Sequence, residues 1–327
     1  MMGITDTRRA RIQTVYSRVS MRNRFICLLA FVCFLATGLH GEDAVCLSRT
    51  TVIGLSGEPS EGLTAADFRV TVGGKAASVQ SATPAGGPPR VIILVDASAN
   101  HNQSTWAATQ VLVDEFLAGL PAVADLTLLT FDDKVQHVVH ATDRASLQGT
   151  WGEMFPSGKR ESEAGLLEAI KKGNVSFDGY RQGDAEFLIT TSDQTHKETE
   201  QALSEQRVAG IRFFGASFDQ ARRAGPDRFG VNMTVENYSP LEAAAKTSGG
   251  MWLWFDMSSQ DPTASLRSAT AGGKSTAVLV QNYLALQLQL TSPITKPEKL
   301  KIELVKESKV KAQDRFTTYP RELFPCK

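Results

Sequence analysis

The clearest signal for the fold is the stretch Val91-Ile-Ile-Leu-Val-Asp-Ala-Ser-Ala-Asn100. An apolar run of this kind, ending here in Asp96, is typical of a parallel strand that is covered on both faces of its sheet. Further strands are expected at 126–131, 187–190, 211–214 and 251–255, and helices at 105–120, around 166–170, 198–208 and 241–247. Strands that alternate with helices at this spacing predict a doubly wound, mostly parallel α/β sheet. Residues 135–139 are expected to add an antiparallel strand after a turn at Asp132-Asp133.

Short β segments are expected on both sides of this sheet. Residues 51–53 and 68–72 are expected as strands, with Gly73-Gly74 closing a hairpin. Residues 283–290 and 300–304 alternate apolar and polar, and 310–316 are expected to return as the partner of 300–304. The expected organisation is a leader (1–41), an N-terminal β module and linker (42–89), the main α/β domain (90–258) and a C-terminal β extension (259–327).

The leader has the layout of a secretory signal peptide. Met21-Arg-Asn-Arg24 is basic, residues 25–39 are nearly all apolar, and small residues follow up to Gly41. The apolar run is shorter than the roughly 20 residues of a comfortable membrane span. An uncleaved anchor is the alternative, and only then would the chain be attached to a membrane. Since residues 1–20 are polar and rich in Arg, a start at Met21 is a second alternative. We expect a periplasmic or secreted protein with a signal peptide at about 21–41.

Cysteine usage agrees with export. Cys27 and Cys33 lie in the leader, and Cys46 and Cys326 remain near the two ends of the mature chain. An oxidising compartment would allow Cys46 and Cys326 to form a disulfide, with two unpaired thiols as the alternative.

Three oxygen-bearing side chains lie at alternate positions of the loop after the first strand: Asp96, Ser98 and Asn100. A second carboxylate, Asp193, follows the strand at 187–190. Because parallel strands end at the same edge of a sheet, Asp96 and Asp193 can meet there. Oxygen ligands suit a hard cation such as Mg²⁺.

Each of these residues also has a simpler interpretation. Asp96 could cap a helix, Ser98 and Asn100 are common turn residues, and Asp193 could be a solvated loop acid. His101 lies beside the loop, where a metal ligand and an ordinary core or surface histidine are the alternatives.

Residues 90–258 resemble a von Willebrand factor type A (vWA) domain. That family carries an Asp-x-Ser-x-Ser loop after its first strand, a Thr from a second loop and an Asp from a third, which together form the metal-ion-dependent adhesion site. Asp96 and Ser98 match the first motif, Asn100 replaces its last Ser, and Asp193 matches the third-loop Asp.

The second loop departs from the family pattern. Aligning the helix around 166–170 puts Ala164 at the Thr position, and Ser162 is the nearest hydroxyl; Gln194 stands where Gly is usual. The resemblance implies a degenerate site for Mg²⁺, with Mn²⁺ or Ca²⁺ as alternatives. Its ligands would be Asp96, Ser98, Asn100 and Asp193, with Ser162 as an additional candidate.

The flanking segments also carry a resemblance. Gly62-Leu-Thr-Ala-Ala-Asp-Phe68 with Gly73-Gly-Lys75 is similar to the β module of an exported group, the vWA-related domain proteins of Acidobacteria. Tyr283-Leu284 and residues 300–319 are similar to that group's C-terminal portion. The resemblance covers nearly all of the mature chain.

The function that this resemblance implies is an exported protein-binding module, used in adhesion or assembly, whose cation holds an Asp or Glu of a partner protein. The alternative is a metal-independent structural or assembly component of the cell envelope, which Ala164 favours. The sequence contains no Gly-x-Ser-x-Gly elbow, phosphate loop or dinucleotide fingerprint, so we do not expect an enzyme. A hydrolase using Ser98 would need a base that the sequence does not identify.

Composition bears on the kind of partner. The chain has 35 Lys plus Arg and 35 Asp plus Glu. A nucleic-acid partner is therefore not expected, since such binding needs a basic surface that displaces counterions.

Overall fold

A computed structural model provides the structure of the chain. It describes residues 46–55, 62–84, 87–181, 183–192, 195–218, 239–255, 257, 262–305 and 316–325, with the backbone alone for 46–55, 262 and 316–317. The leader expected at 1–41, the Cys46–Cys326 disulfide and Asp193 therefore lie outside the described residues or side chains.

The main domain is built on a six-stranded sheet of order β6-β5-β4-β7-β8-β9. Its strands are β4 (Arg90–Asp96), β5 (Val123–Phe131), β6 (Val135–Asp143), β7 (Ala185–Thr190), β8 (Arg212–Ser217) and β9 (Trp252–Trp254). β6 is antiparallel to β5, and the other neighbouring strands are parallel. This arrangement confirms the doubly wound, mostly parallel α/β sheet predicted from the sequence.

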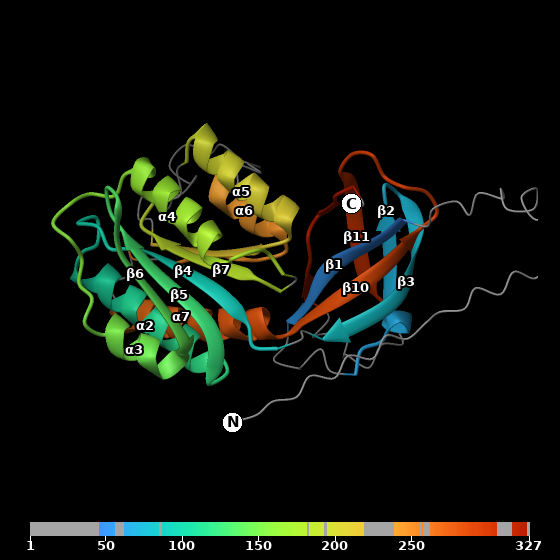
Figure 1. Ribbon diagram of the computed structural model, residues 1–327. Helices are drawn as coiled ribbons and strands as arrows, with labels where there is room; N and C mark the ends of the chain where they lie inside the picture. Colours follow the sequence, from blue (N-terminus) through green and yellow to red (C-terminus); the bar gives the residue numbers. More distant parts are fainter. Residues whose placement is uncertain are drawn as a thin grey trace, which may run out of the picture. The chain divides into compact units, whose positions relative to one another are not determined.

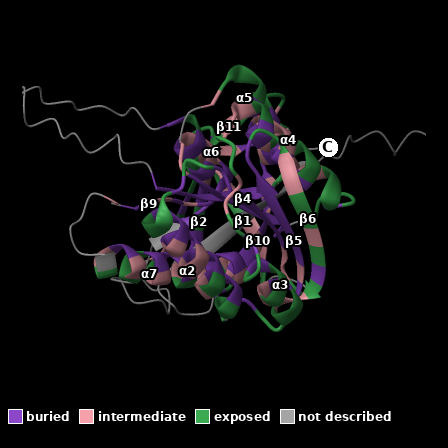
Figure 2. Cartoon of the chain, turned by 90° about the vertical axis from the view of Figure 1, so that its left-hand side faces the viewer, coloured by how far each residue is buried: buried purple, intermediate pink, exposed green. Residues whose placement is uncertain are grey.

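Helices cover both faces of this sheet (Figure 1). They are α2 (Gln103–Gly119), α3 (Arg144–Trp151), α4 (Glu163–Ser176), α5 (Lys197–Ala209), α6 (Pro240–Ser248) and α7 (Pro262–Gln281). On β4, Val91 and Ile93 belong to the core with α2, α3 and α7, whereas Ile92 and Leu94 belong to the core with α4, α5 and α6. Figure 2 shows the buried strands between helices whose outer surfaces are exposed. The continuous apolar run of β4 is thus explained by burial on both faces.

Two helices were not predicted from the sequence, α3 and α7. Helix α7 falls in residues for which the sequence suggested β structure, and it includes the weak helix formers Gly272 and Gly273. A side chain at Gly273 would lie 2.5 Å from the Leu112 carbonyl oxygen of α2. Glycine therefore allows α7 to pack closely on α2, and this contact outweighs the poor local propensity.

A buried arginine joins α7 to the sheet. Arg212, the first residue of β8, donates hydrogen bonds to the carbonyl oxygens of Leu279, Val280 and Gly183, each 2.9 Å away. The first two carbonyls belong to the last turn of α7, where no helical donor is available.

The flanking segments form a second, antiparallel sheet of order β12-β1-β10-β3-β2-β11-β13. Its strands are β1 (Cys46–Leu55), β2 (Phe68–Val72), β3 (Lys75–Pro84), β10 (Tyr283–Leu290), β11 (Glu298–Leu304), β12 (Phe316–Thr318) and β13 (Glu322–Leu323). Strand β10 pairs with β1 and β3, so the segments before and after the α/β domain build one sheet together.

Residues 310–316 were predicted to pair with 300–304. This prediction was wrong for Phe316, the described end of that segment. Strand β11 pairs with β2 and β13, whereas Phe316 pairs with Leu55 of β1. Residues 310–315 lie outside the described residues. Among the helices that are described, none is both long and apolar enough to cross a bilayer.

Candidate functional site

The candidate site lies at the carboxyl ends of the central strands. Val95 of β4 pairs with Thr130 of β5 and with Ile189 of β7. Asp96, the last residue of β4, and Thr191, the first residue after β7, therefore lie at the same edge of the sheet. This is the edge where doubly wound sheets bind their ligands.

Asp96 is fully buried, and two loops converge on its carboxylate. Oδ1 accepts a hydrogen bond from the Ser98 amide at 2.8 Å. Oδ2 accepts hydrogen bonds from the Thr191 amide at 3.1 Å and the Thr191 hydroxyl at 2.5 Å. The loops after β4 and β7 thus meet at this residue, as the parallel topology requires.

Ser98 and Asn100 differ in their exposure. The Ser98 side chain is buried, and its hydroxyl oxygen accepts the Asn100 amide at 3.2 Å, while Asn100 itself is exposed. The loop is held by a 2.6 Å hydrogen bond from the Ala99 amide to the Lys159 carbonyl, and by another of 2.6 Å from the Ser157 amide to the Ala97 carbonyl. The loop conformation is therefore set by its contacts with the 157–159 segment.

The His101 side chain lies in the protein interior beside Asp96 and is not exposed to solvent. Its side chain is buried, Nε2 lies 3.6 Å from Asp96 Oδ2, and the ring packs edge-on against Trp106 and Phe218. The polar neighbour of the ring is Asp96, through its carboxylate and its backbone. Burial lowers the pKa of His101, an effect that the nearby Asp96 charge only partly opposes. At neutral pH the ring is therefore neutral, and it makes no described hydrogen bond to the Ser98 hydroxyl that would mark it as a hydrolytic base.

Glu161 is a site residue that no sequence motif identified. Its Oε1 accepts the Thr190 hydroxyl at 2.9 Å and its Oε2 lies 3.3 Å from the Thr191 hydroxyl, which itself donates to Asp96 Oδ2. Burial, followed by the negative charge of Asp96, raises the pKa of Glu161 to about 8. One signal was available: Glu161 lies in the second loop, next to Ser162, the N-cap of α4.

The two second-loop residues named from the sequence, Ser162 and Ala164, have no described side-chain contact with Asp96. Ser162 caps α4, since its hydroxyl accepts the Gly165 amide at 3.1 Å and lies 3.2 Å from the Asp133 carbonyl oxygen. Ala164 is exposed on the first turn of α4. A side chain at Gly165 would lie 2.2 Å from the Asp132 carbonyl oxygen, so glycine is needed for this close approach. The side chain that reaches Asp96 from this loop is therefore that of Glu161.

A further acid, Asp132, lies at the same edge and holds its loops by hydrogen bonds. It accepts the Ser157 hydroxyl and the Gln136 side-chain amide, each at 2.6 Å, and the Lys134 amide at 3.1 Å. Although burial opposes ionisation, these hydrogen bonds hold the pKa of Asp132 well below its usual range. Asp132 is thus a fixed anion that ties the loops together.

The donor types at this edge suit a hard cation. Asp96 and Glu161 supply carboxyl oxygens, and Ser98 and Thr191 supply hydroxyl oxygens, the ligand types of Mg²⁺. The described side chains include no group of three or more His, Cys, Asp or Glu that could hold a metal ion. These oxygen ligands suit Mg²⁺. A complete set of ligands would also need the exposed Asn100 and Asp193, and Asp193 lies outside the described residues.

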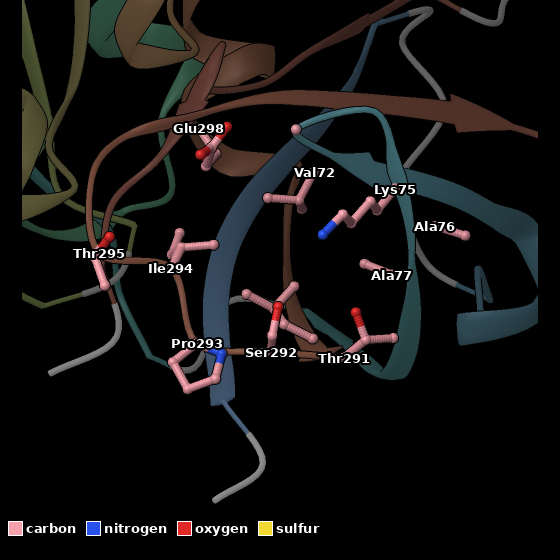
Figure 3. A pocket seen from close by; sticks show the side chains of 12 residues that line it. Val72, Lys75, Ala76, Ala77, Thr291, Ser292, Pro293, Ile294, Thr295 and Glu298 are labelled. Atoms are coloured by element: carbon pink, nitrogen blue, oxygen red, sulfur yellow. The ribbon is translucent and has the colours of Figure 1, made fainter. Parts of the chain in front are cut away.

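A separate shallow pocket of about 210 Å³ lies on the antiparallel sheet (Figure 3). The β2–β3 turn and the segment after β10 line it, and Lys75 and Glu298 are its charged residues. It shares no residue with the Asp96 edge.

The strand order and the loops at the Asp96 edge define the class of the domain, a doubly wound α/β domain with a vWA-like fold. No family model matches the sequence, and no curated protein matches it. Among solved structures, the chain is similar to a von Willebrand factor type A protein from Catenulispora acidiphila (10% identity, 88% of this chain and 64% of that chain, TM-score 0.44). It is also similar to an aerotolerance-related membrane protein from Bacteroides fragilis (16% identity, 56% and 99%, TM-score 0.39) and to BatB from Bacteroides thetaiotaomicron (17% identity, 57% and 99%, TM-score 0.38). The strand order, rather than these similarities, defines the fold.

Proposed function

We propose that this chain is an exported protein-binding module that docks an Asp or Glu of a partner protein at the Asp96 edge of its parallel sheet. The observation that carries the proposal is the Asp96 carboxylate, which is buried and held in place by donors from two loops. An anion that is already fixed in a polar edge needs no reorganisation when a ligand arrives.

A divalent cation is the proposed bridge. Asp96 and Ser98 would hold Mg²⁺, or Mn²⁺ or Ca²⁺, together with Asn100 and Asp193. When bound, the cation would supply a coordination position that a partner carboxylate fills. Thr191 orients Asp96 through two hydrogen bonds, and the 157–159 segment holds the Ser98 loop.

The proposal includes the location of the protein outside the cytoplasm. The leader pattern at 21–41 supports export to the periplasm or the outside of the cell. The resemblance of the flanking segments 62–75 and 283–319 to the modules of the exported Acidobacteria-type group supports assignment to that group.

Calorimetric titration with Mg²⁺ and Mn²⁺ tests the cation. We expect binding by the wild type, loss of binding in Asp96→Asn, and unchanged binding in Glu153→Gln, which alters an exposed acid outside the site. Circular dichroism would verify that both variants fold. An absence of binding heat in all three proteins would discard the metal bridge.

The alternative is a metal-independent assembly component. It is favoured by Glu161, whose carboxyl group shares the Thr191 hydroxyl with Asp96, and by Ala164, which offers no ligand atom and is exposed. Capture of envelope proteins on immobilised chain, with EDTA and with Mg²⁺, separates the two. Capture that EDTA abolishes supports the bridge, and capture of the same protein under both conditions supports the alternative.

A further inference from the structure

The pocket on the antiparallel sheet lies where two neighbouring strands separate. Strand β10 pairs with β3 as far as Gln289 and Ser78, and the residues that follow β10, 291–295, line the pocket. The first residues of β3, 75–77, line it as well, and among the described strands they pair with β2 alone. The pocket of about 210 Å³ therefore occupies the place that β10 leaves beside β3 (Figure 3).

The backbone of Ala76 faces this pocket with its hydrogen-bonding groups unused. Val72 and Lys75 flank the two-residue turn Gly73-Gly74, whose positive φ angles of 56° and 81° are those of a type I′ hairpin turn. In such a hairpin the flanking residues exchange both hydrogen bonds, and the next pair directs its N–H and C=O groups away from the partner strand. Ala76 belongs to that next pair, and within the described residues no backbone hydrogen bond joins it to 291–295. The pocket thus offers the free donor and acceptor of an extended strand.

Two charged side chains reach the pocket from different strands. Lys75 begins β3 and Glu298 begins β11, and neither forms an ion pair with any other described residue. Figure 3 shows the amino group of Lys75 directed into the hollow. A side chain at Gly73 would lie 2.8 Å from Glu298 Oε2, so glycine leaves room for this carboxylate beside the turn. The Gly73 amide donates a 2.9 Å hydrogen bond to the Lys299 carbonyl, which joins the turn to β11.

The floor of the pocket is apolar. Val72 and Leu290 are buried, Ile294 is half-buried, and all three belong to the core of the antiparallel sheet or pack against it. The volume of the pocket lies below the roughly 300–1,000 Å³ that is usual for drug-sized ligands, so its ligand is a smaller molecule.

We propose that this pocket binds a short peptide with free ends, a zwitterion of about two residues. The backbone of the peptide would pair with Ala76, as when an extended peptide adds a strand to an exposed sheet edge. Its carboxylate would face Lys75, its ammonium group would face Glu298, and a small apolar side chain would cover the floor. This is a second site, and it does not depend on the docking function proposed for the Asp96 edge.

Other small ligands match the pocket less well. A dicarboxylate would bring a negative charge to Glu298, and a diamine would bring a positive charge to Lys75. A free amino acid carries both charges but has no peptide unit to pair with Ala76. A peptide that is blocked at one end keeps the peptide unit but lacks one of the charges. The amino acid and the blocked peptides are therefore the comparison ligands.

Methyl NMR of the full chain measures binding at the pocket. The methyl signals of Ala76 and Ile294 are followed while the dipeptide valyl-valine is added to on the order of 10 mM, since contacts at an open pocket give millimolar affinity. We expect saturable shifts of both signals. N-acetyl-valyl-valine and valyl-valinamide, which each lack one charge, should bind about three- to fivefold more weakly. Free valine should also bind more weakly than the dipeptide.

Two variants assign each charge to its partner. Lys75→Gln should weaken the binding of valyl-valine by about three- to fivefold and leave that of valyl-valinamide unchanged. Glu298→Gln should weaken the binding of valyl-valine equally and leave that of N-acetyl-valyl-valine unchanged. Lys301→Gln, which alters an exposed lysine of β11 outside the pocket, is the matched control and should bind all the ligands as the wild type does.

Three outcomes would overturn the proposal. They are the absence of shifts at Ala76 and Ile294, equal affinities for the free and the blocked dipeptides, and an affinity for free valine that equals that for valyl-valine.

Discussion

The sharpest prediction concerns Glu186, a fully buried acid of β7. The Gln206 side-chain amide donates to its Oε2 at 2.8 Å, but within the described residues Glu186 Oε1 and Gln206 Oε1 have no hydrogen-bond partner. Burial raises the pKa of Glu186 to about 8, an effect that the Gln206 hydrogen bond only partly offsets. The folded protein therefore keeps this side chain protonated at pH values where the unfolded chain has already ionised.

The sign of the pH dependence follows from proton linkage. Between about pH 4.5 and about pH 8 the unfolded chain binds fewer protons at this position, so the free energy of unfolding falls as the pH rises. Each pKa unit between the unfolded and the folded state corresponds to about 1.4 kcal/mol. The rise of the Glu186 pKa from 4.5 to about 8 therefore changes the free energy of unfolding by several kcal/mol over this pH range. In Glu186→Gln the contribution vanishes, because the amide does not ionise; its NH₂ group can donate to the free Gln206 Oε1, and its carbonyl oxygen can accept from Gln206 Nε2.

Urea unfolding at several pH values measures the difference. The free energies of unfolding of wild type and Glu186→Gln should be similar near pH 4, and the variant should be more stable by several kcal/mol near pH 8. The pH dependence that Glu161 adds is common to both proteins and cancels in the comparison. Glu153→Gln, at an exposed position, should follow the wild type throughout. Parallel curves for wild type and Glu186→Gln would refute the reasoning.

Three further substitutions test the local support of the site and of the fold. In urea unfolding, Gly165→Ala should lower the free energy of unfolding by about 1–3 kcal/mol, because the new methyl group would lie 2.2 Å from the Asp132 carbonyl oxygen. The control Gly158→Ala, whose methyl group meets no atom within 4 Å, should leave the free energy of unfolding nearly unchanged. Asn102→Ala should cost about 1 kcal/mol, because Asn102 caps α2, and restoration of stability by Asn102→Ser would identify the cap as the cause. Arg212→Met should cost about 3–5 kcal/mol in chemical unfolding, since three buried carbonyl groups lose their donor, and a loss below 1 kcal/mol would contradict this role.

Asp96 could be predicted as a site residue because a local sequence pattern identifies it. Asp96 directly follows an apolar strand, and parallel topology brings the end of that strand next to the end of β7. The position of Asp96 at a ligand-binding edge could therefore be expected from the sequence. Glu161 could not be singled out in this way, because its contacts with Thr190 and Asp96 join residues that are 29 and 65 positions apart. His101 is a similar case, since its neutral, buried state depends on the packing of Trp106 and Phe218 around it.

The amino-acid sequence alone determined the alternation of strands and helices, and with it the doubly wound sheet, because hydrophobic periodicity and turn residues act over short stretches of chain. Tertiary structure decided which residues from separate loops share the edge of that sheet. It also decided that α7 packs on α2 despite its glycines, and that strands from both ends of the chain form one antiparallel sheet. Such outcomes depend on close packing and on hydrogen bonds between distant segments, and no local pattern encodes these contacts.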